Sequence, residues 1–320
     1  MPRKPMISEV REHAKYERLV AATRSLQPLP TAVAHPCDET SLRGALEAAE
    51  ADMIAPILVG PRGKIESLAK SLDLDLGGAT IVDAPHSQAA AEKAVALVRA
   101  GEAELLMKGS LHSDELLAAV TKRDTGLRTG RRISHVFVMD VPNHPRTLFI
   151  TDAAVNIAPD LMAKRDIIQN AIDLYAGLGL GIPKVAILSA VETINPGIPS
   201  TIEAAALCKM AERGQISGGD LDGPLAFDNA ISLEAARIKG IKSTVAGRAD
   251  ILVVPDLEAG NMLAKNLTFL SGADAAGIVL GARVPIILTS RADNVRSRMA
   301  SCAVAMLLAH SRRANAPIMA

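Results

Sequence analysis

The sequence contains no tryptophan, two tyrosines and four phenylalanines, so aromatic residues make up 2% of its 320 residues. Proteins that bind single-stranded nucleic acid without sequence preference stack the bases on aromatic side chains. The 35 basic and 35 acidic residues cancel, so no global field draws the chain to nucleic acid or to anionic lipid. We therefore expect neither a nucleic-acid partner nor a membrane partner.

Cysteines and long apolar runs are also scarce. The three cysteines, Cys37, Cys208 and Cys302, are isolated and lack C-x-x-C spacing, so they indicate neither a disulfide framework nor a zinc site. No window approaches the roughly 18 unbroken apolar residues of a membrane span. The N-terminal stretch MPRKPMISEVREHAKYERL lacks the apolar region of a secretory signal. These absences predict a cytoplasmic protein.

The residues that are present describe a globular α/β protein. A hydrophobic content of 49% and a mean hydropathy of +0.21 allow a large buried core. Strand-like and helix-like segments alternate along almost the whole chain, beginning with a helix expected over residues 8–26. Such alternation predicts mainly parallel sheets with helices on both faces. The near-continuous apolar runs ILVVP and VPIIL agree, because strands buried on both faces lose the alternation of apolar and polar residues.

The alternation breaks after Arg123. Two β-type runs there lie too close together for an intervening helix, which predicts a hairpin over about residues 133–151. Further on, the segment GQISGGDLDGPLAFDNA is rich in turn-forming residues and precedes a helix expected from Ile231 to Ile238. We predict two α/β domains, with residues 1–152 and 281–320 in the first and residues 153–280 in the second.

The strand VPIILTS is followed directly by Ser290, Arg291 and Asp293, and we expect the last helix to run from Arg291 to about Arg313. In open α/β sheets ligands bind beyond the carboxyl ends of strands, where the amides and the positive dipole end of a helix are exposed. Ser290 and Asp293 also match the S-x-x-D pattern that caps a helix. The pattern thus predicts an anion-binding, catalytic corner, with simple capping as the alternative.

Other element boundaries carry further candidate residues. Lys108, Gly109 and Ser110 close the strand ELLMKG, where glycine lets the backbone approach a phosphoryl group; a plain turn is the alternative. Asp152 and Asn156 could order a cleft or build an Asx turn. The remaining candidates are four side chains near a helix start or before a strand, for which a solvated surface position is the alternative: Asn261, Lys265, Arg131 and Arg132.

Several of these segments belong to a recognisable set. LLMKGSLHS, TLFITDAAVN, PKVAILSAVE, DGPLAFDNA, PDLEAGNMLAKNL and TSRADN occur in the order and at the distances of the phosphate acetyltransferase/phosphate butyryltransferase family. From about Thr31 to the C-terminus the chain resembles that family. The resemblance implies two domains around an active-site cleft, with the fold of isopropylmalate-dehydrogenase-type enzymes. It also implies a homodimer that binds acyl-CoA and phosphate and holds no permanent cofactor.

The activity that the resemblance implies is transfer of a short acyl group between coenzyme A, as a substrate, and inorganic phosphate. A thiol with a pKa of about 8.5 needs a positioned base at neutral pH, and Asp293 is the candidate. Ser290 would donate to a developing oxyanion or thiolate, and Arg291 would bind phosphate through its planar fork. The other candidates are expected to bind substrate: Lys108, Gly109, Ser110, Arg132, Asp152, Asn156, Asn261 and Lys265.

One position departs from the family pattern. In the acetyltransferase branch the aspartate base follows the serine–arginine pair by two helical turns, which here falls on Ser297, and serine cannot act as the base. The S-R-A-D form with Asp293 is that of the butyryl-like branch. Three and seven residues return to about the same helix face, so Asp293 could replace the missing aspartate. We expect acetyl-CoA as the substrate because acetyl is the commoner acyl group in cells, whereas the S-R-A-D form favours butyryl-CoA, which is the alternative.

Two further functions remain open from the sequence. A metal- and NAD-dependent dehydrogenase of the same fold would need an aspartate cluster and a tyrosine–lysine pair, and neither Tyr16 nor Tyr175 is placed for one. The segment GLGLGIP follows a helix and precedes a strand, the reverse of the dinucleotide-binding order. The acidic residues are spread over separate elements, so we predict no metal site. The other possibility is a non-catalytic acyl-CoA-binding protein, which the serine at position 297 makes conceivable.

Overall fold

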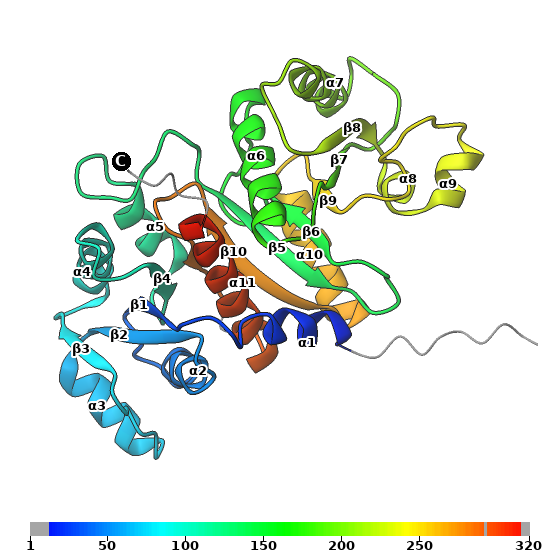
Figure 1. Cartoon of the computed structure of the whole chain (residues 1–320). Coiled ribbons are helices and arrows are strands. Elements are labelled where there is room, and N and C mark those ends of the chain that lie inside the picture. Colours follow the sequence, from blue (N-terminus) through cyan, green and yellow to red (C-terminus); the bar gives the residue numbers. More distant parts are fainter. Residues whose placement is uncertain (1–12, 291–292, 315–320) are drawn as a thin grey trace, which may run out of the picture.

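The computed structural model describes residues 13–290 and 293–314 of the chain. Within these residues the backbone forms a single sheet of eleven strands, in the order β3-β2-β1-β4-β11-β10-β5-β6-β9-β7-β8 (Figure 1). The strands are β1 Leu29–Ala34, β2 Ile54–Gly60, β3 Thr80–Asp83, β4 Leu105–Lys108, β5 Ser134–Asp140, β6 Leu148–Thr151, β7 Lys184–Leu188, β8 Asp220–Leu225, β9 Ile251–Val253, β10 Asp274–Leu280 and β11 Ile286–Ile287.

The helices lie between the strands in the chain, as the alternation predicts. They are α1 Ala14–Ala21, α2 Glu39–Glu50, α3 Arg62–Ser71, α4 Ser87–Arg99, α5 Ser113–Thr121, α6 Leu161–Gly177, α7 Pro199–Glu212, α8 Phe227–Ile231, α9 Leu233–Ile238, α10 Leu257–Ser271 and α11 Val295–Ala314. Aspartate caps start several of them: the side chains of Asp38, Asp160 and Asp256 accept from backbone amides in the first turns of α2, α6 and α10.

The sheet is parallel at both ends and antiparallel in the middle. Strands β3, β2, β1, β4 and β11 pair in parallel, as do β6, β9, β7 and β8. Between these sets, β10 and β5 form antiparallel ladders. The pairing of β5 with β6 is the predicted hairpin. The mainly parallel α/β class with helices on both faces is confirmed.

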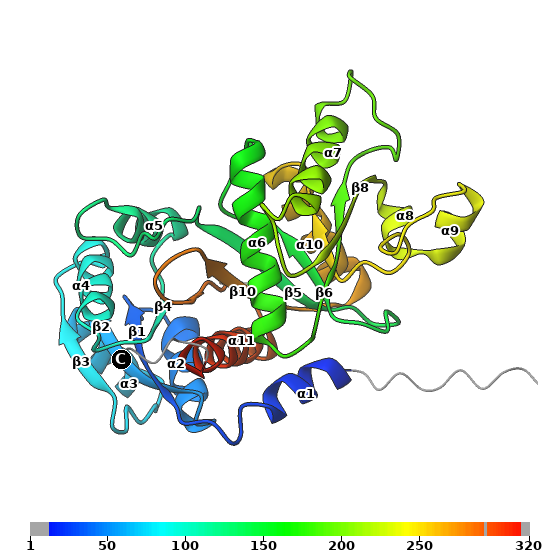
Figure 2. The ribbon, with the colours of Figure 1, turned by 45° about the horizontal axis from the view of Figure 1, so that its top comes forward.

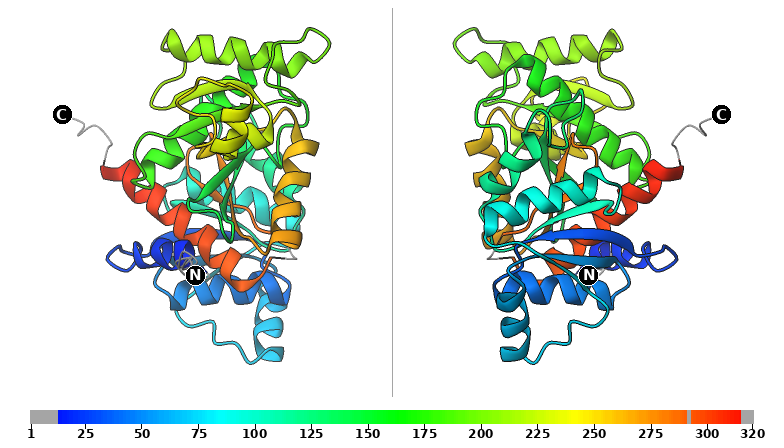
Figure 3. Two further views of the ribbon diagram at one scale, coloured as in Figure 1. Left: turned by 90° about the vertical axis from the view of Figure 1, so that its right-hand side faces the viewer. Right: turned by 90° about the vertical axis from the view of Figure 1, so that its left-hand side faces the viewer.

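Helices cover the two faces of the sheet differently. On one face a single apolar cluster runs the length of the molecule and includes side chains of α2, α3, α6, α7 and α11. On the other face there are two separate clusters, one under α4 and α5 and one under α8, α9 and α10. Figure 2 shows α6 beside α11, and Figure 3 shows α3 and α7 at opposite ends of the molecule. We call this second face, with its two separate clusters, the divided face. The gap between its clusters lies where the two halves of the sheet meet.

Three boundaries differ from the sequence-based expectation. The turn-prone segment contains an edge strand, β8, which tolerates glycine, proline and two aspartates because one side of its backbone has no partner strand. The helix expected at 8–26 is described as α1, Ala14–Ala21, and residues before His13 lie outside the described part. The last helix begins at Val295 rather than Arg291.

The domain boundaries at residues 152 and 281 stay a prediction. Both chain segments that they separate contribute strands to the same sheet. No helix in the described part of the chain is long and apolar enough to cross a bilayer. In the same part, no group of three or more His, Cys, Asp or Glu side chains is placed to hold a metal ion.

Candidate active site

The carboxyl ends of three parallel strands meet at one edge of the sheet. β4 pairs with β1 on one side and with β11 on the other. A small pocket lies just beyond these ends, and we call it the strand-end pocket. Its wall combines the ends of β4 and β11, the start of α2 and one side chain of α11: Asp38, Thr40, Ser41, Met107, Lys108, Gly109, Thr289, Ser290 and Arg298. Ligands of open α/β sheets bind at such an edge.

The turn after β4 is held tightly against the end of β1. The Gly109 amide donates to the Ala34 carbonyl at 2.9 Å, and the Ser110 amide and hydroxyl donate to the His35 carbonyl at 2.9 and 2.8 Å. A Cβ atom on Gly109 would lie 2.3 Å from the Ala34 oxygen and 2.5 Å from the His35 oxygen. Glycine at 109 is therefore required by the approach of two backbones, a reason that lies in the fold rather than in a bound ligand.

We expect Gly109→Ala to lower the free energy of unfolding by about 1–3 kcal/mol, because the backbone of β1 must move to admit the methyl group. Gly63 in α3 has nothing within 4 Å of an added Cβ. Gly63→Ala should instead raise stability by about 0.5–1 kcal/mol, since alanine loses less backbone entropy in a helix. Urea unfolding of both variants measures the difference. Equal stability of the two variants would contradict this account of Gly109.

Ser290 and Asp293 form a turn that precedes α11. The Ser290 amide donates to Asp293 Oδ2 at 2.7 Å, and the Asp293 amide donates to the Ser290 carbonyl at 3.2 Å. The helix is capped by Asn294, whose Oδ1 accepts from the Ser297 amide at 2.8 Å. The expectation that Asp293 lies one turn inside the helix is therefore wrong, because asparagine takes the capping position. Capping of α11 does not account for Asp293.

The Asp293 carboxyl lies among groups that act on it in opposite directions. Burial raises its pKa above the usual value, while the Ser290 amide and the charges of Arg298 and Lys108 lower it. The direction that results is a raised pKa. A more basic carboxylate is a stronger proton acceptor while it remains ionised near neutral pH.

Arg298 was not identified from the sequence. Its side chain is only 7% exposed, its Nη1 donates to the Asp293 carbonyl at 2.5 Å, and its stem packs so closely on α2 that a Cβ on Gly44 would lie 2.9 Å from its Cδ and Nε. Nε is buried and, among the described residues, has no hydrogen-bond partner. The Ser-Arg pair at residues 297–298 is a local sequence signal for a functional arginine. It does not indicate that this arginine lies at the ends of β4 and β11.

Two further positions matter for the sequence-based assignment of the catalytic residues, Arg291 and Ser297. Arg291 lies outside the described residues. Ser297, at the position where the acetyltransferase branch has its aspartate, is 5% exposed in the first turn of α11, and its carbonyl accepts from the Ser301 hydroxyl at 2.7 Å. The strand-end pocket thus brings together Lys108, Gly109 and Ser290, with Asp293 and Arg298 beside them.

A second group of candidates lies where β6 ends. The Asp152 carboxylate accepts from the amides of Ala154 and Val155 at 3.0 Å, from the Asn156 amide at 3.1 Å and from Asn156 Nδ2 at 2.5 Å. Both of its oxygens are therefore used in building the turn. These contacts of Asp152 are those of an Asx turn, and this residue orders the chain between β6 and α6.

Asn156 connects this turn to an arginine-lined pocket. Arg132 Nε donates to Asn156 Oδ1 at 2.8 Å. The pocket, which we call the arginine pocket, lies beside α5 and is lined by Leu117, Thr121, Arg128, Arg131, Arg132, Ile133, Val155 and Asn156. Arg131 is paired with Asp173 at 2.5 Å, and Arg128 is exposed. The pocket therefore carries an excess of positive charge.

The remaining candidates lie on α10. Asn261 Nδ2 donates to the Ala153 carbonyl at 3.3 Å, which attaches the helix to the turn after β6. Lys265 is exposed one turn further on. Val155, in the turn after β6, and Leu288, after β11, both pack against the apolar cluster under α4 and α5.

His135, on β5, is a second residue that sequence reasoning did not identify. It is fully buried, its ring lies 4.4 Å from that of Phe137 in an edge-to-face arrangement, and neither ring nitrogen has a partner among the described residues. Burial lowers its pKa to about 4, against the opposing charge of Asp152. The imidazole is therefore neutral at physiological pH.

Comparisons with known proteins agree with this geometry. The family described as "Phosphate acetyl/butaryl transferase" matches residues 87–306. A phosphate acetyltransferase of Rhizobium meliloti is 73% identical over 301 residues, which are 94% of this chain and 95% of that protein. A phosphate butyryltransferase of Clostridium acetobutylicum is 41% identical over 93% of this chain and 99% of its own length. The crystal structure of a branched-chain phosphotransacylase from Enterococcus faecalis V583 covers 88% of this chain and 99% of that chain, with 31% identity and a TM-score of 0.76. The chain belongs to the phosphate acetyl/butyryl transferase family.

Proposed function

We propose that the protein transfers an acetyl group between coenzyme A and inorganic phosphate, with both molecules as substrates. The observation that supports this most directly is the meeting of Lys108, Ser290, Asp293 and Arg298 at the edge where three parallel strands end. The 73% identity to a phosphate acetyltransferase favours acetyl over longer acyl groups. Cytoplasmic residence stays a prediction from the sequence.

The charged side chains around the strand-end pocket suit a phosphate or an acyl phosphate. Lys108 and Arg298 supply two positive charges, while Asp38, whose carboxylate caps α2, contributes one negative charge to the same wall. Arg298 offers a planar fork that matches phosphate oxygens, and it is buried, so its charge acts through little water. In this proposal Arg291 adds a second guanidinium for phosphate, and Ser290 donates to the oxygen of the reacting carbonyl.

Proton transfer falls to Asp293. When acyl-CoA is made, Asp293 takes the thiol proton, the thiolate attacks the carbonyl carbon of the acyl phosphate, and the C–S bond forms. The C–O bond to phosphate then breaks, and the departing phosphate takes the proton from Asp293. In the opposite direction Asp293 takes the proton of hydrogen phosphate as a phosphate oxygen attacks the thioester, the C–S bond breaks, and Asp293 gives this proton to the departing thiolate. Ser290 stabilises the negative charge that develops on the carbonyl oxygen.

The arginine pocket is the proposed site for the phosphates of coenzyme A. It holds Arg128, Arg131 and Arg132, and Asn156 fixes the direction of Arg132. Arg132 and Asn156 join it to the turn after β6, which Asn261 attaches to α10. Asp152 and Asn156 therefore act by ordering this part of the binding surface, and Lys265 is placed to meet an anionic substrate from solvent.

Release of free thiol from acyl-CoA, measured with and without phosphate, tests the proposal. The series should include acetyl-, propionyl-, butyryl- and longer acyl-CoA. We expect phosphate-dependent release with the highest kcat/KM for acetyl-CoA; a maximum at butyryl-CoA would assign the protein to the alternative activity. Coenzyme A binding without release would indicate a non-catalytic binding protein, and NADH formation from a hydroxy acid would indicate a dehydrogenase.

Arg291→Lys tests the proposed phosphate contact that follows from the sequence. Lysine keeps the charge and loses the planar fork, so KM for phosphate should rise or turnover should fall by about tenfold or more, on the order of 1.4 kcal/mol. Thermal unfolding should barely change. Steady-state kinetics at varied phosphate concentration measure both quantities. Unchanged KM and turnover would indicate that Arg291 is a surface cation with no part in phosphate binding.

We also propose a homodimer that pairs through α10. Three large apolar side chains of this helix are exposed: Met262 by 65%, Phe269 by 73% and Leu270 by 81%. Exposed apolar side chains grouped on one helix mark an interaction site. Phe269→Glu should convert the dimer to a monomer in sedimentation velocity, whereas Lys70→Glu, at an exposed position on α3, should not. A monomeric wild-type protein at micromolar concentration would contradict the proposal.

A further inference from the structure

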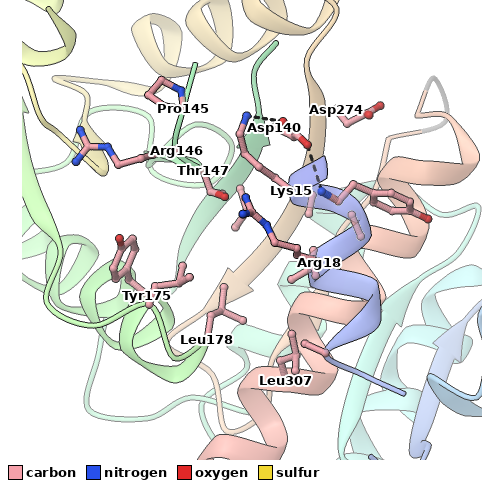
Figure 4. A pocket seen from close by; sticks show the side chains of 17 residues that line it. Lys15, Arg18, Asp140, Pro145, Arg146, Thr147, Tyr175, Leu178, Asp274 and Leu307 are labelled. Carbon is pink, nitrogen blue, oxygen red and sulfur yellow. Dashed lines mark hydrogen bonds and ion pairs between the residues drawn. The ribbon is translucent and has the colours of Figure 1, made fainter. Parts of the chain in front are cut away.

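A cavity of about 440 Å³ lies between α1, the end of α6, α11 and the β5–β6 hairpin (Figure 4). We call it the α1 pocket. Val138 forms part of its wall and belongs to the continuous apolar cluster under α11, whereas its neighbour Phe137 packs on the divided face. Adjacent strand residues point to opposite faces, so the α1 pocket opens on the other side of the sheet from Phe137. It shares no lining residue with the strand-end pocket or the arginine pocket.

The wall of the α1 pocket is mainly apolar and includes Leu178, Leu307 and Val138. Tyr16 and Tyr175 also line it, and they are the only tyrosines in the chain. Burial raises the pKa of both phenols, which therefore stay neutral and keep their hydroxyl hydrogens. The volume falls within the range of about 300–1,000 Å³ that is usual for small-molecule sites. The proposed reaction uses none of these residues.

One charge on this wall has no counter-ion within residues 13–290 and 293–314. In Figure 4 the Arg18 side chain extends from α1 across the pocket. Among the described residues no carboxylate lies within ion-pairing distance of its guanidinium, although other charges of the wall are paired. Those pairs are Lys15 with Asp140 at 2.6 Å, Arg146 with Asp250 at 3.2 Å and Arg296 with Asp274 at 3.2 Å.

We propose that the α1 pocket binds an amphipathic carboxylate, with an aliphatic body of medium length against Leu178, Leu307 and Val138 and its carboxylate at Arg18. The apolar wall gains from excluding water, and the guanidinium fork fits the two carboxylate oxygens. A neutral amphiphile cannot pair with the Arg18 guanidinium, and a small anion such as acetate has no aliphatic body to bury against the apolar wall. The site therefore selects for charge and apolar length together.

Octanoate is the probe, and the protein itself provides the signal. The chain has no tryptophan, so its intrinsic fluorescence comes from Tyr16 and Tyr175, both of which line the pocket. We expect a saturable change in tyrosine emission on titration with octanoate, a matching isotherm by calorimetry, and much weaker binding of octanol and of acetate. The measurement needs no acyl-CoA and no turnover, so it is independent of the proposed catalytic function.

Two variants locate the site. Arg18→Ala should weaken octanoate binding about tenfold or more, whereas Arg24→Ala, an exposed arginine outside the pocket, should leave it unchanged. Leu178→Trp, followed by calorimetry, should abolish binding by filling the cavity; its thermal unfolding curve shows whether it is folded. The proposal is overturned if octanoate gives no saturable signal, if Arg18→Ala binds as tightly as the wild type, or if octanol binds as tightly as octanoate.

Discussion

Asp293→Asn lowers turnover by about 10²–10⁴-fold, the usual contribution of a positioned base, if Asp293 takes the thiol proton. The amide fills the same space, and its oxygen can still accept from the Ser290 amide, so the turn before α11 is kept. Because Asn294 rather than Asp293 caps α11, the helix should lose little stability. Stopped-flow thiol assays and thermal unfolding measure the two effects separately.

The pH dependence identifies the group. The base must be ionised, and burial raises the pKa of Asp293, so the acid limb of wild-type turnover should lie above the ordinary aspartate range. Activity should rise with pH through that limb, and the limb should be absent in Asp293→Asn. The deficit of the variant should also shrink toward pH of about 8.5, where coenzyme A arrives already ionised.

Asp124→Asn, an exposed aspartate in the loop after α5, is the matched control and should turn over normally. Near-normal turnover of Asp293→Asn at neutral pH would remove Asp293 from the mechanism. Two other aspartates that follow strands, Asp152 and Asp256, would be poor replacements for it as the base. Asp152 uses both oxygens to build a turn, and Asp256 caps α10 by accepting from the Ala259 amide at 2.9 Å.

Arg298→Met lowers kcat/KM for phosphate by about 10²–10³-fold if the guanidinium binds the phosphate that accepts or releases the acyl group, which is the effect of removing one buried donor at a reacting centre. The methionine keeps an apolar stem of similar length against Gly44 and removes a buried charge. The lost hydrogen bond from the charged guanidinium to the Asp293 carbonyl costs about 1.5–3 kcal/mol, so the fold should persist.

Phosphate protection against unfolding distinguishes binding from architecture. A ligand that binds only the folded protein raises its melting temperature, because it stabilises the protein by RT ln(1 + L/Kd) at free ligand concentration L. Phosphate should raise the melting temperature of the wild type and of Arg312→Met, an exposed arginine near the other end of α11, but not that of Arg298→Met. Normal phosphate protection in Arg298→Met would make Arg298 a structural residue that holds the turn at Asp293.

The secondary structure of this protein depends mainly on residues that are close together in the chain, so the sequence alone determined it. The alternation of apolar runs with helical segments is a short-range pattern, so it predicted the α/β class and most elements. The hairpin of β5 and β6 followed from the short distance between two β-type runs. Collinear motifs predicted the family, which the comparisons confirm over residues 87–306 and beyond. The strand end at Lys108 was located for the same reason, whereas β11 ends at Ile287, three residues before Ser290.

Only the tertiary structure decided which groups meet. β11 pairs beside β4 although about half of the chain separates them, and this pairing places Ser290 next to Lys108. Arg298 enters the same pocket because α11 packs across α2, a contact that no spacing along the chain encodes. Local pattern also misassigned Asp293 to a helix, since Asn294 competes for the cap. The α1 pocket exists because α1 docks on β5 and α11, and its side chains come from distant segments that only the folded sheet brings together.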